Sequence, residues 1–180
     1  MSPPGTGSRA RLIDFSAIYQ THAAHVHRFA LFLSGDPTLA EDLTAESFVR
    51  LWLARERLEL ATVRAYLFAI ARNLYLQQRR GRRPQEPFDE ATADPRPGPA
   101  ERAMARDELA STLAALQALP ELDRAALLMR ADEELAYEEI AAALGLTPAA
   151  VRVRVHRARL KLVEAREIAA APRSIPEDPR

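Results

Sequence analysis

The 180-residue sequence contains no cysteine, which excludes a disulfide framework and a thiolate metal site. It has no apolar run long enough to span a bilayer. The first residues, MSPPGTGSRARL, lack the hydrophobic core of a signal peptide. We therefore expect a cytoplasmic protein with no membrane insertion.

Catalytic motifs are missing as well. The sequence has no nucleophile-elbow serine, phosphate-binding glycine loop or paired-carboxylate motif, so we expect neither an enzyme nor a bound cofactor. His22, His25 and His27 lie close together, but no cysteine or suitable further ligand completes a tetrahedral site near them. We predict no metal site.

The charges balance overall but are unevenly distributed. Lysine plus arginine and aspartate plus glutamate number 25 each, and a net charge of zero argues against a non-specific nucleic-acid coat protein. Acidic residues gather at 132–139, whereas arginines gather at 79–83 and 152–159. This asymmetry is more informative than the total charge.

The composition divides the chain into two parts. Proline and glycine cluster at 84–102, where hydrophobic periodicity stops, as is typical of a linker. On both sides Ala, Leu, Arg and Glu recur at helical spacing, without hairpin signals. We therefore expect an all-α protein, with two small helical domains at 12–83 and 103–170 joined by a flexible linker.

The segment AAVRVRVHRARLKL, at 149–162, is compatible with either a strand or a helix. Its alternating valines and arginines resemble a half-buried strand. However, Thr147 offers an N-cap hydroxyl, and Pro148 suits the first position of a helix. At 100° per residue, four apolar side chains fall on one narrow face: Val151, Val155, Ala158 and Leu162. The segment is therefore predicted to be a helix.

A shorter apolar face lies upstream and ends at Gly145, which can take the left-handed conformation that closes a helix. Two helices joined in this way form a helix-turn-helix, whose second helix reads DNA. Its outward side chains are candidates for base contacts: Ala149, Arg152, Val153, His156 and Arg157. Three flanking cations are candidates for phosphate contacts: Arg154, Arg159 and Lys161. An ordinary helical hairpin with a solvated basic face is the alternative.

LPELDRAALLMRADEELAYEEIAAALGLTPAAVRVRVHRARLKL, at 119–162, resembles region 4 of bacterial sigma factors of the extracytoplasmic-function (ECF) type. The resemblance includes the Leu-Pro start, the YEEIA helix and the VHRAR ending. It implies that this half reads the minus-thirty-five element and contacts the β flap of RNA polymerase. The family usually has Gly and Ser where Glu134 and Ala136 stand, and often Ser at Val153. The DNA-binding domain of a response regulator would look similar.

DFSAIYQTHAAHVHRFALFLSGDPTLAEDLTAESFVRLW, at 14–52, resembles region 2 of the same family, where a helix docks on the polymerase β′ clamp helices. The pattern predicts a helix with two faces. One face should point inward: Ala40, Leu43, Thr44, Phe48, Leu51 and Trp52. The other, part acidic and part apolar, is predicted to bind polymerase: Asp42, Ala45, Glu46, Val49 and Leu53. The family often has Gln at Ala45. A helix buried on both sides is the alternative.

TVRAYLFAIARNLYLQQRRGRR, at 62–83, resembles the next helix of region 2, which often has Trp at Tyr66 and Asp at Gln77. Its predicted core stripe is Val63, Leu67, Ile70 and Leu74. On the opposite side arginines alternate with aromatic rings, a pattern that holds single-stranded DNA. The residues predicted to hold the minus-ten element are Arg64, Phe68, Arg72, Asn73, Tyr75 and Arg79. Alternatively, Phe68 and Tyr75 pack against a neighbouring helix.

The resemblance implies a sigma factor that directs core RNA polymerase to specific promoters. It also implies that the loop ARERLELAT, at 54–62, captures a flipped base of the minus-ten element, and that an anti-sigma factor controls the chain. Exposed apolar positions such as Leu53 and Leu160 are compatible with such a partner. The alternatives are a stand-alone helix-turn-helix regulator with an N-terminal sensing or dimerisation domain, and a helical adaptor that binds no DNA. The stripe at 64–79 favours the sigma factor.

Overall fold

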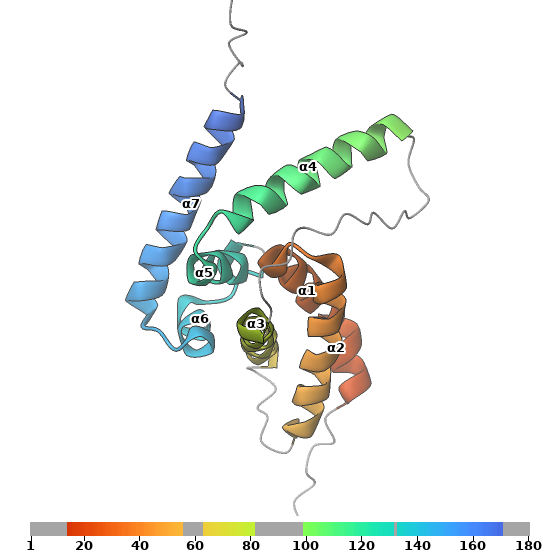
Figure 1. Cartoon of the computed structure of the whole chain (residues 1–180). Coiled ribbons are helices and arrows are strands. Elements are labelled where there is room, and N and C mark those ends of the chain that lie inside the picture. Colours follow the sequence, from red (N-terminus) through yellow and green to blue (C-terminus); the bar gives the residue numbers. More distant parts are fainter. Residues whose placement is uncertain (1–13, 56–62, 82–98, 132, 171–180) are drawn as a thin grey trace, which may run out of the picture.

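The computed structural model describes residues 14–55, 63–81, 99–131 and 133–170, and within these ranges the chain is all-α (Figure 1). This confirms the predicted fold class. The helices are α1 (Phe15–Ser34), α2 (Pro37–Leu53), α3 (Val63–Gly81), α4 (Pro99–Gln117), α5 (Glu121–Ala131), α6 (Tyr137–Leu144) and α7 (Pro148–Ala170). Helix α4 begins inside the range 84–102 that the composition predicts as a linker, and the rest of that range lies outside the described residues. No helix in the described ranges is both long and apolar enough to cross a membrane.

Local signals set the ends of the first two helices. The Asp14 carboxylate accepts a hydrogen bond from the Ala17 amide at 3.0 Å, and Asp36 caps α2 through the Leu39 amide at the same distance. Gly35 ends α1 with a φ of 75°, which favours glycine. Helix α3 packs against both α1 and α2, so the three helices share one core.

The C-terminal half contains the predicted helix-turn-helix. Gly145 closes α6 with a φ of 67°, and the Thr147 hydroxyl accepts a hydrogen bond from the Ala150 amide at 3.2 Å. Three members of the predicted stripe of α7 are buried: Val151, Val155 and Ala158. The fourth, Leu162, is partly buried. The segment is therefore a helix rather than a strand, as predicted.

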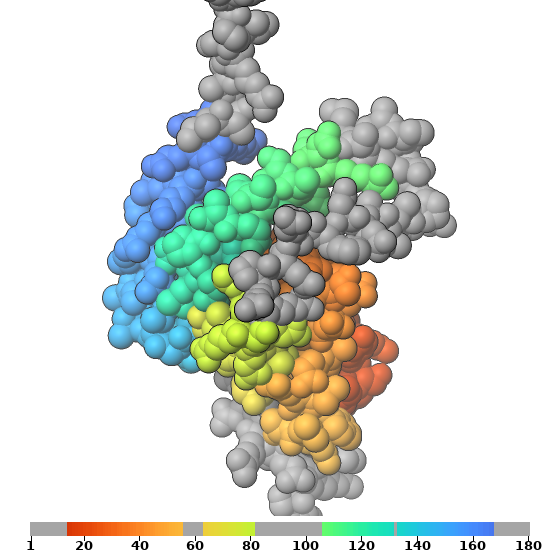
Figure 2. All heavy atoms as spheres, in the orientation of Figure 1, coloured from red at the N-terminus to blue at the C-terminus, as the bar shows by residue number. Residues whose placement is uncertain are grey.

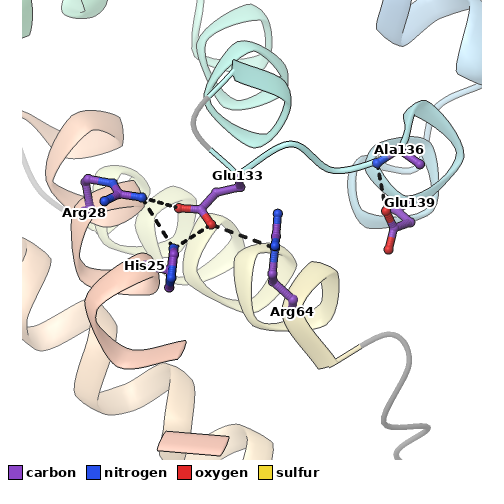
Figure 3. A network of polar contacts seen from close by, with 6 residues as sticks. All are labelled: His25, Arg28, Arg64, Glu133, Ala136 and Glu139. Atoms are coloured by element: carbon purple, nitrogen blue, oxygen red, sulfur yellow. Dashed lines mark hydrogen bonds and ion pairs between the residues drawn. The ribbon is translucent and has the colours of Figure 1, made fainter. Parts of the chain in front are cut away.

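The turn before α6 takes an unfavourable backbone conformation. Glu134 has a φ of 53°, in the left-handed region where the family usually has glycine. Ala136 has no side-chain oxygen to cap α6, although the Glu139 carboxylate accepts a hydrogen bond from the Ala136 amide at 2.8 Å (Figure 3). The helix-turn-helix therefore folds without two of its usual local supports.

Restoring these supports is expected to stabilise the C-terminal half. Glu134→Gly should add roughly 1 kcal/mol by relieving the left-handed strain, and Ala136→Ser about 1 kcal/mol by capping α6. Thermal unfolding of each variant and of the pair measures the effect. Glu134→Ala is the control, because it removes the carboxylate but keeps the strain. Equal melting temperatures for the Gly and Ala variants would contradict the backbone explanation.

The two halves pack directly against each other. Helices α4 and α5 contact α1, and α6 contacts α3, so the buried apolar residues form one continuous cluster. In Figure 2, α3 lies between the orange N-terminal helices and the green and teal C-terminal ones. The Gln117 amide nitrogen at the end of α4 donates to the carbonyl of Phe32 at 3.1 Å, close to the end of α1.

Candidate nucleic-acid interface

The outward face of α7 lies where the sequence predicts it. Seven of the eight side chains proposed for DNA are exposed: Ala149, Arg152, Val153, His156, Arg157, Arg159 and Lys161. The eighth, Arg154, is partly buried. Val153 is 55% exposed and helps to line a shallow surface hollow together with Ala149, Ala150, Arg154 and Arg157.

Several of the arginines on this face are held by neighbours. The Arg154 guanidinium donates to Asp123 Oδ1 at 2.7 Å, and Arg157 Nη1 lies 4.0 Å from Asp123 Oδ2. Arg152 lies over the Tyr137 ring, with its guanidinium carbon 5.1 Å from the ring centroid. Arg152, Arg154 and Arg157 therefore each lie near a side chain of a neighbouring helix.

Helix α2 has the two predicted faces, with one correction. The side chains proposed to bind polymerase are all exposed: Asp42, Ala45, Glu46, Val49 and Leu53. Of the predicted inward residues, Trp52 is 45% exposed, so its assignment to the core is wrong. Its ring meets Phe15 edge to face at 5.1 Å and lies under the Arg55 guanidinium, because α1 begins beside the end of α2 and leaves one side of the ring open.

Helix α3 departs most from the prediction. Its core stripe is buried as expected: Val63, Leu67, Ile70 and Leu74. However, Phe68 is also fully buried, with its ring centroid 4.9 Å from that of Phe29, and Tyr75 is buried too. The predicted outward stripe of aromatic rings is therefore wrong in this arrangement. The physical reason is that α3 packs on α1 and α2 on one side and beside the C-terminal half on another.

Two predicted DNA contacts of α3 are engaged by α5 instead. Arg72 forms a bidentate ion pair with Glu121, with nitrogen–oxygen distances of 2.7 and 2.8 Å. The Tyr75 hydroxyl accepts a hydrogen bond from Arg124 at 3.2 Å. Burial lowers the pKa of Arg124, while Tyr75 and Glu121 oppose that change. Arg72 and Tyr75 are therefore covered by the C-terminal half.

A second polar cluster joins the halves around Glu133, whose side chain is only 1% exposed (Figure 3). His25 Nδ1 lies 3.0 Å from its carboxylate, Arg28 donates to it at 3.2 Å, and Arg64 Nε lies 3.8 Å away. Burial lowers the pKa of the nearby His22, and His25 and Arg64 lower it further. Three cationic or titratable groups of the N-terminal half thus converge on one carboxylate of the other half.

Helix α3 has an exposed strip that was not predicted as a unit from the sequence. It consists of Tyr66, Asn73, Gln77 and Arg80, and Arg79 lies beside it. Only Asn73 and Arg79 belong to the predicted set. A usable signal was present, since these four positions recur at helical spacing and two of them, Tyr66 and Gln77, differ from the family that the sequence resembles.

The base-capturing loop at 54–62 lies outside the described residues except for its first two positions. Among the residues that the structure describes, no group of three His, Cys, Asp or Glu side chains is placed to hold a metal ion. His25 contacts Glu133 instead.

Together, the fold and these faces define a two-part, all-α protein with a helix-turn-helix of the DNA-binding class. Residues 18–85 match the family model described as Sigma-70 region 2, and residues 109–162 match Sigma-70, region 4. The chain belongs to the ECF sigma factors of the sigma-70 family.

The similar proteins cover both halves. The chain is 37% identical over 165 residues to the ECF RNA polymerase sigma factor SigE of Mycolicibacterium smegmatis, covering 87% of this chain and 63% of SigE. It is 36% identical over 157 residues to ECF sigma factor ShbA of Streptomyces griseus subsp. griseus, covering 77% of this chain and 82% of ShbA. The sigma factor RpoE of Bartonella quintana, solved in complex with the anti-sigma factor NepR, superposes with a TM-score of 0.71 and 25% identity, covering 86% of this chain and 98% of RpoE.

Proposed function

We propose that this chain is a promoter-specific initiation factor that binds core RNA polymerase and directs it to promoter DNA. One observation carries this proposal. The exposed docking face of α2 and the exposed basic face of α7 lie on different halves of the chain, so one half can hold the polymerase while the other reads duplex DNA. Because the polymerase that it serves is cytoplasmic, the chain would act in the cytoplasm.

The minus-thirty-five element is assigned to α7. Its outward arginines can reach base edges in the major groove, and its remaining cations lie along the flanks where the phosphates pass. Val153 is exposed at the centre of this face and cannot form a hydrogen bond, so it suits the methyl group of a thymine. The promoter should therefore contain thymine at the position that Val153 meets.

The minus-ten element is assigned to the exposed strip of α3, with Tyr66 as the ring that stacks on an unpaired base and Asn73 and Gln77 as its polar neighbours. Arg79 and Arg80 supply positive charge for the strand at the end of the helix. Arg64 and Arg72 can join this surface only after they leave Glu133 and Glu121.

The packed arrangement of the halves corresponds to an inactive form. Arg72 and Tyr75 are covered, and two halves that pack together cannot reach two separated promoter elements at once. The superposition with RpoE extends over 86% of this chain, and RpoE was solved with an anti-sigma factor bound. An anti-sigma factor would therefore hold this chain in the closed arrangement, and its release would allow the halves to separate.

Run-off transcription with purified core polymerase on genomic fragments tests the proposal. An initiation factor gives discrete transcripts only when both the chain and the core enzyme are present. A stand-alone regulator would bind duplex DNA with the same selectivity in the absence of polymerase and would give no new transcript. An adaptor would bind no DNA in either case, so the three functions have different outcomes.

The docking face gives a second test. Asp42→Lys combined with Leu53→Ser should weaken core polymerase binding tenfold or more, because removing a well-placed interface contact costs about 2 kcal/mol and 1.4 kcal/mol corresponds to tenfold. Leu53 is 73% exposed, so the fold should not change. The matched control is Asp107→Lys with Leu109→Ser on α4, where both side chains are also exposed. Equal binding by both double variants would refute the assignment of α2.

A further inference from the structure

We infer that Asp123, a buried residue of α5 outside the recognition helix, positions Arg154 and Arg157 for base reading and so sets the selectivity of α7. The inference rests on the proposed function, since it requires that α7 reads duplex DNA. Asp123 touches no DNA itself. Its role is to fix two side chains that do.

The geometry places one carboxylate beneath two arginines. The Asp123 side chain is 1% exposed, and its Oδ1 accepts a hydrogen bond from Arg154 Nη1 at 2.7 Å. Its Oδ2 has no hydrogen-bond donor among the described residues and lies 4.0 Å from Arg157 Nη1. Arg154 and Arg157 are three positions apart on one helix, so a single acid can serve both. A shift of about 1 Å would turn the second contact into a hydrogen bond.

A guanidinium that is bound by a buried carboxylate presents its remaining donors to DNA in one orientation, whereas a free guanidinium does not. Arg154 uses Nη1 on Asp123, which leaves Nε and Nη2 available as a parallel pair of donors. Such a pair matches O6 and N7 of guanine in the major groove. A free arginine would instead follow the nearest phosphate, which carries no sequence information. The Asp123 charge also offsets one of the two cations and thereby reduces non-specific attraction to DNA.

The surface in front of these arginines fits the same role. The shallow hollow on α7 has Ala149, Ala150 and Val153 as its apolar part and Arg154 and Arg157 as its charged part. The methyl group of thymine fits the apolar part, and guanine pairs with the arginines. The preferred ligand is therefore duplex DNA with thymine beside guanine. This assigns Arg154 to base edges, in contrast to the phosphate contact predicted from the sequence.

Selection from randomised duplex DNA, with the full chain alone and together with core polymerase, tests this inference. Titrations then compare the selected sequence with its single-base variants at several salt concentrations. Asp123→Asn should reduce discrimination at the guanine position about tenfold, because a fixed bidentate contact becomes a mobile one. It should also steepen the salt dependence by about one unit, because an uncompensated arginine gains a phosphate.

Two further variants serve as a control for Asp123→Asn and as a substitute for it. Glu138→Gln is the matched control, since it also removes a carboxylate beside an arginine of α7, at 3.6 Å from Arg152, but at an exposed position. It should leave discrimination unchanged, because this solvent-screened pair does not fix the Arg152 guanidinium. If Asp123→Asn does not fold, Arg154→Lys carries the test, because lysine keeps the charge but lacks the two parallel donors. It should lose discrimination at the same base pair.

The outcomes separate the inference from the proposed function. If the wild-type chain selects no sequence, alone or with polymerase, the proposed function is wrong and the inference fails with it. If the wild-type chain is selective and folded Asp123→Asn or Arg154→Lys retains its full profile, the inference alone is overturned. A loss of discrimination in Glu138→Gln equal to that in Asp123→Asn would also overturn it.

Discussion

Reversing the charges of Glu121 and Glu133 together is expected to separate the two halves of the chain. Glu121 holds Arg72 by two hydrogen bonds of 2.7 and 2.8 Å, and buried Glu133 faces His25, Arg28 and Arg64. Removing one partner of a buried ion pair costs about 3 to 5 kcal/mol. Separation of the halves relieves that cost by returning the groups to water. At 1.4 kcal/mol per tenfold, the open form should gain 100-fold or more.

Fluorescence energy transfer measures this separation directly. Because the chain has no cysteine, Glu41→Cys on α2 and Arg166→Cys on α7 give two unique, exposed labelling positions. Transfer should fall in the Glu121→Arg, Glu133→Arg variant, and promoter opening at limiting polymerase should rise. Glu108→Arg with Glu164→Arg reverses two exposed acids and serves as the control. Unchanged transfer in a folded interface variant would show that these pairs do not hold the halves together.

The C-terminal helices follow from the sequence because their signals are local. Thr147 and Pro148 start α7 within a few residues of the side chains that they affect, and Gly145 ends α6 at the residue that needs a positive φ. The valines at 151 and 155 alternate with arginines as in a strand, but the cap and the 100° projection favour a helix. The two helices and their turn were therefore predictable from the sequence, as was most of the exposed face of α7, on which Arg154 is partly buried.

The face of α3 was not predictable in the same way. Helical periodicity identifies one buried stripe, but it does not reveal that a second body covers the other side. That body is the C-terminal half, whose contacts connect residues far apart in sequence, such as Arg28 and Glu133 or Arg72 and Glu121. The acidic group at 132–139 was visible in the sequence, although nothing local indicated which cations would meet its buried member Glu133.

The contact of Asp123 with Arg154 depends on tertiary packing and was not predictable from the sequence. It precedes α7 by more than twenty positions, and in the sequence it looks like an ordinary acid in the first turn of α5, where it also suits the helix dipole. Only the packing of α5 against α7 brings it under Arg154. A pattern that marks the arginines of a recognition helix therefore cannot show which of them are fixed.

Phe68→Ala is expected to destabilise the N-terminal half by about 3 to 5 kcal/mol, because it leaves a cavity in the core beside Phe29. The single tryptophan, Trp52, lies in this half, so its fluorescence during urea unfolding reports the loss. Tyr66→Ala on the same helix is the control. Tyr66 is more exposed, and its removal should change stability by about 0.5 kcal/mol or less while impairing promoter opening through lost stacking. Phe68→Ala could instead keep the wild-type unfolding midpoint and block promoter opening. That result would show that the Phe68 ring contacts DNA during promoter opening and does not stabilise the core.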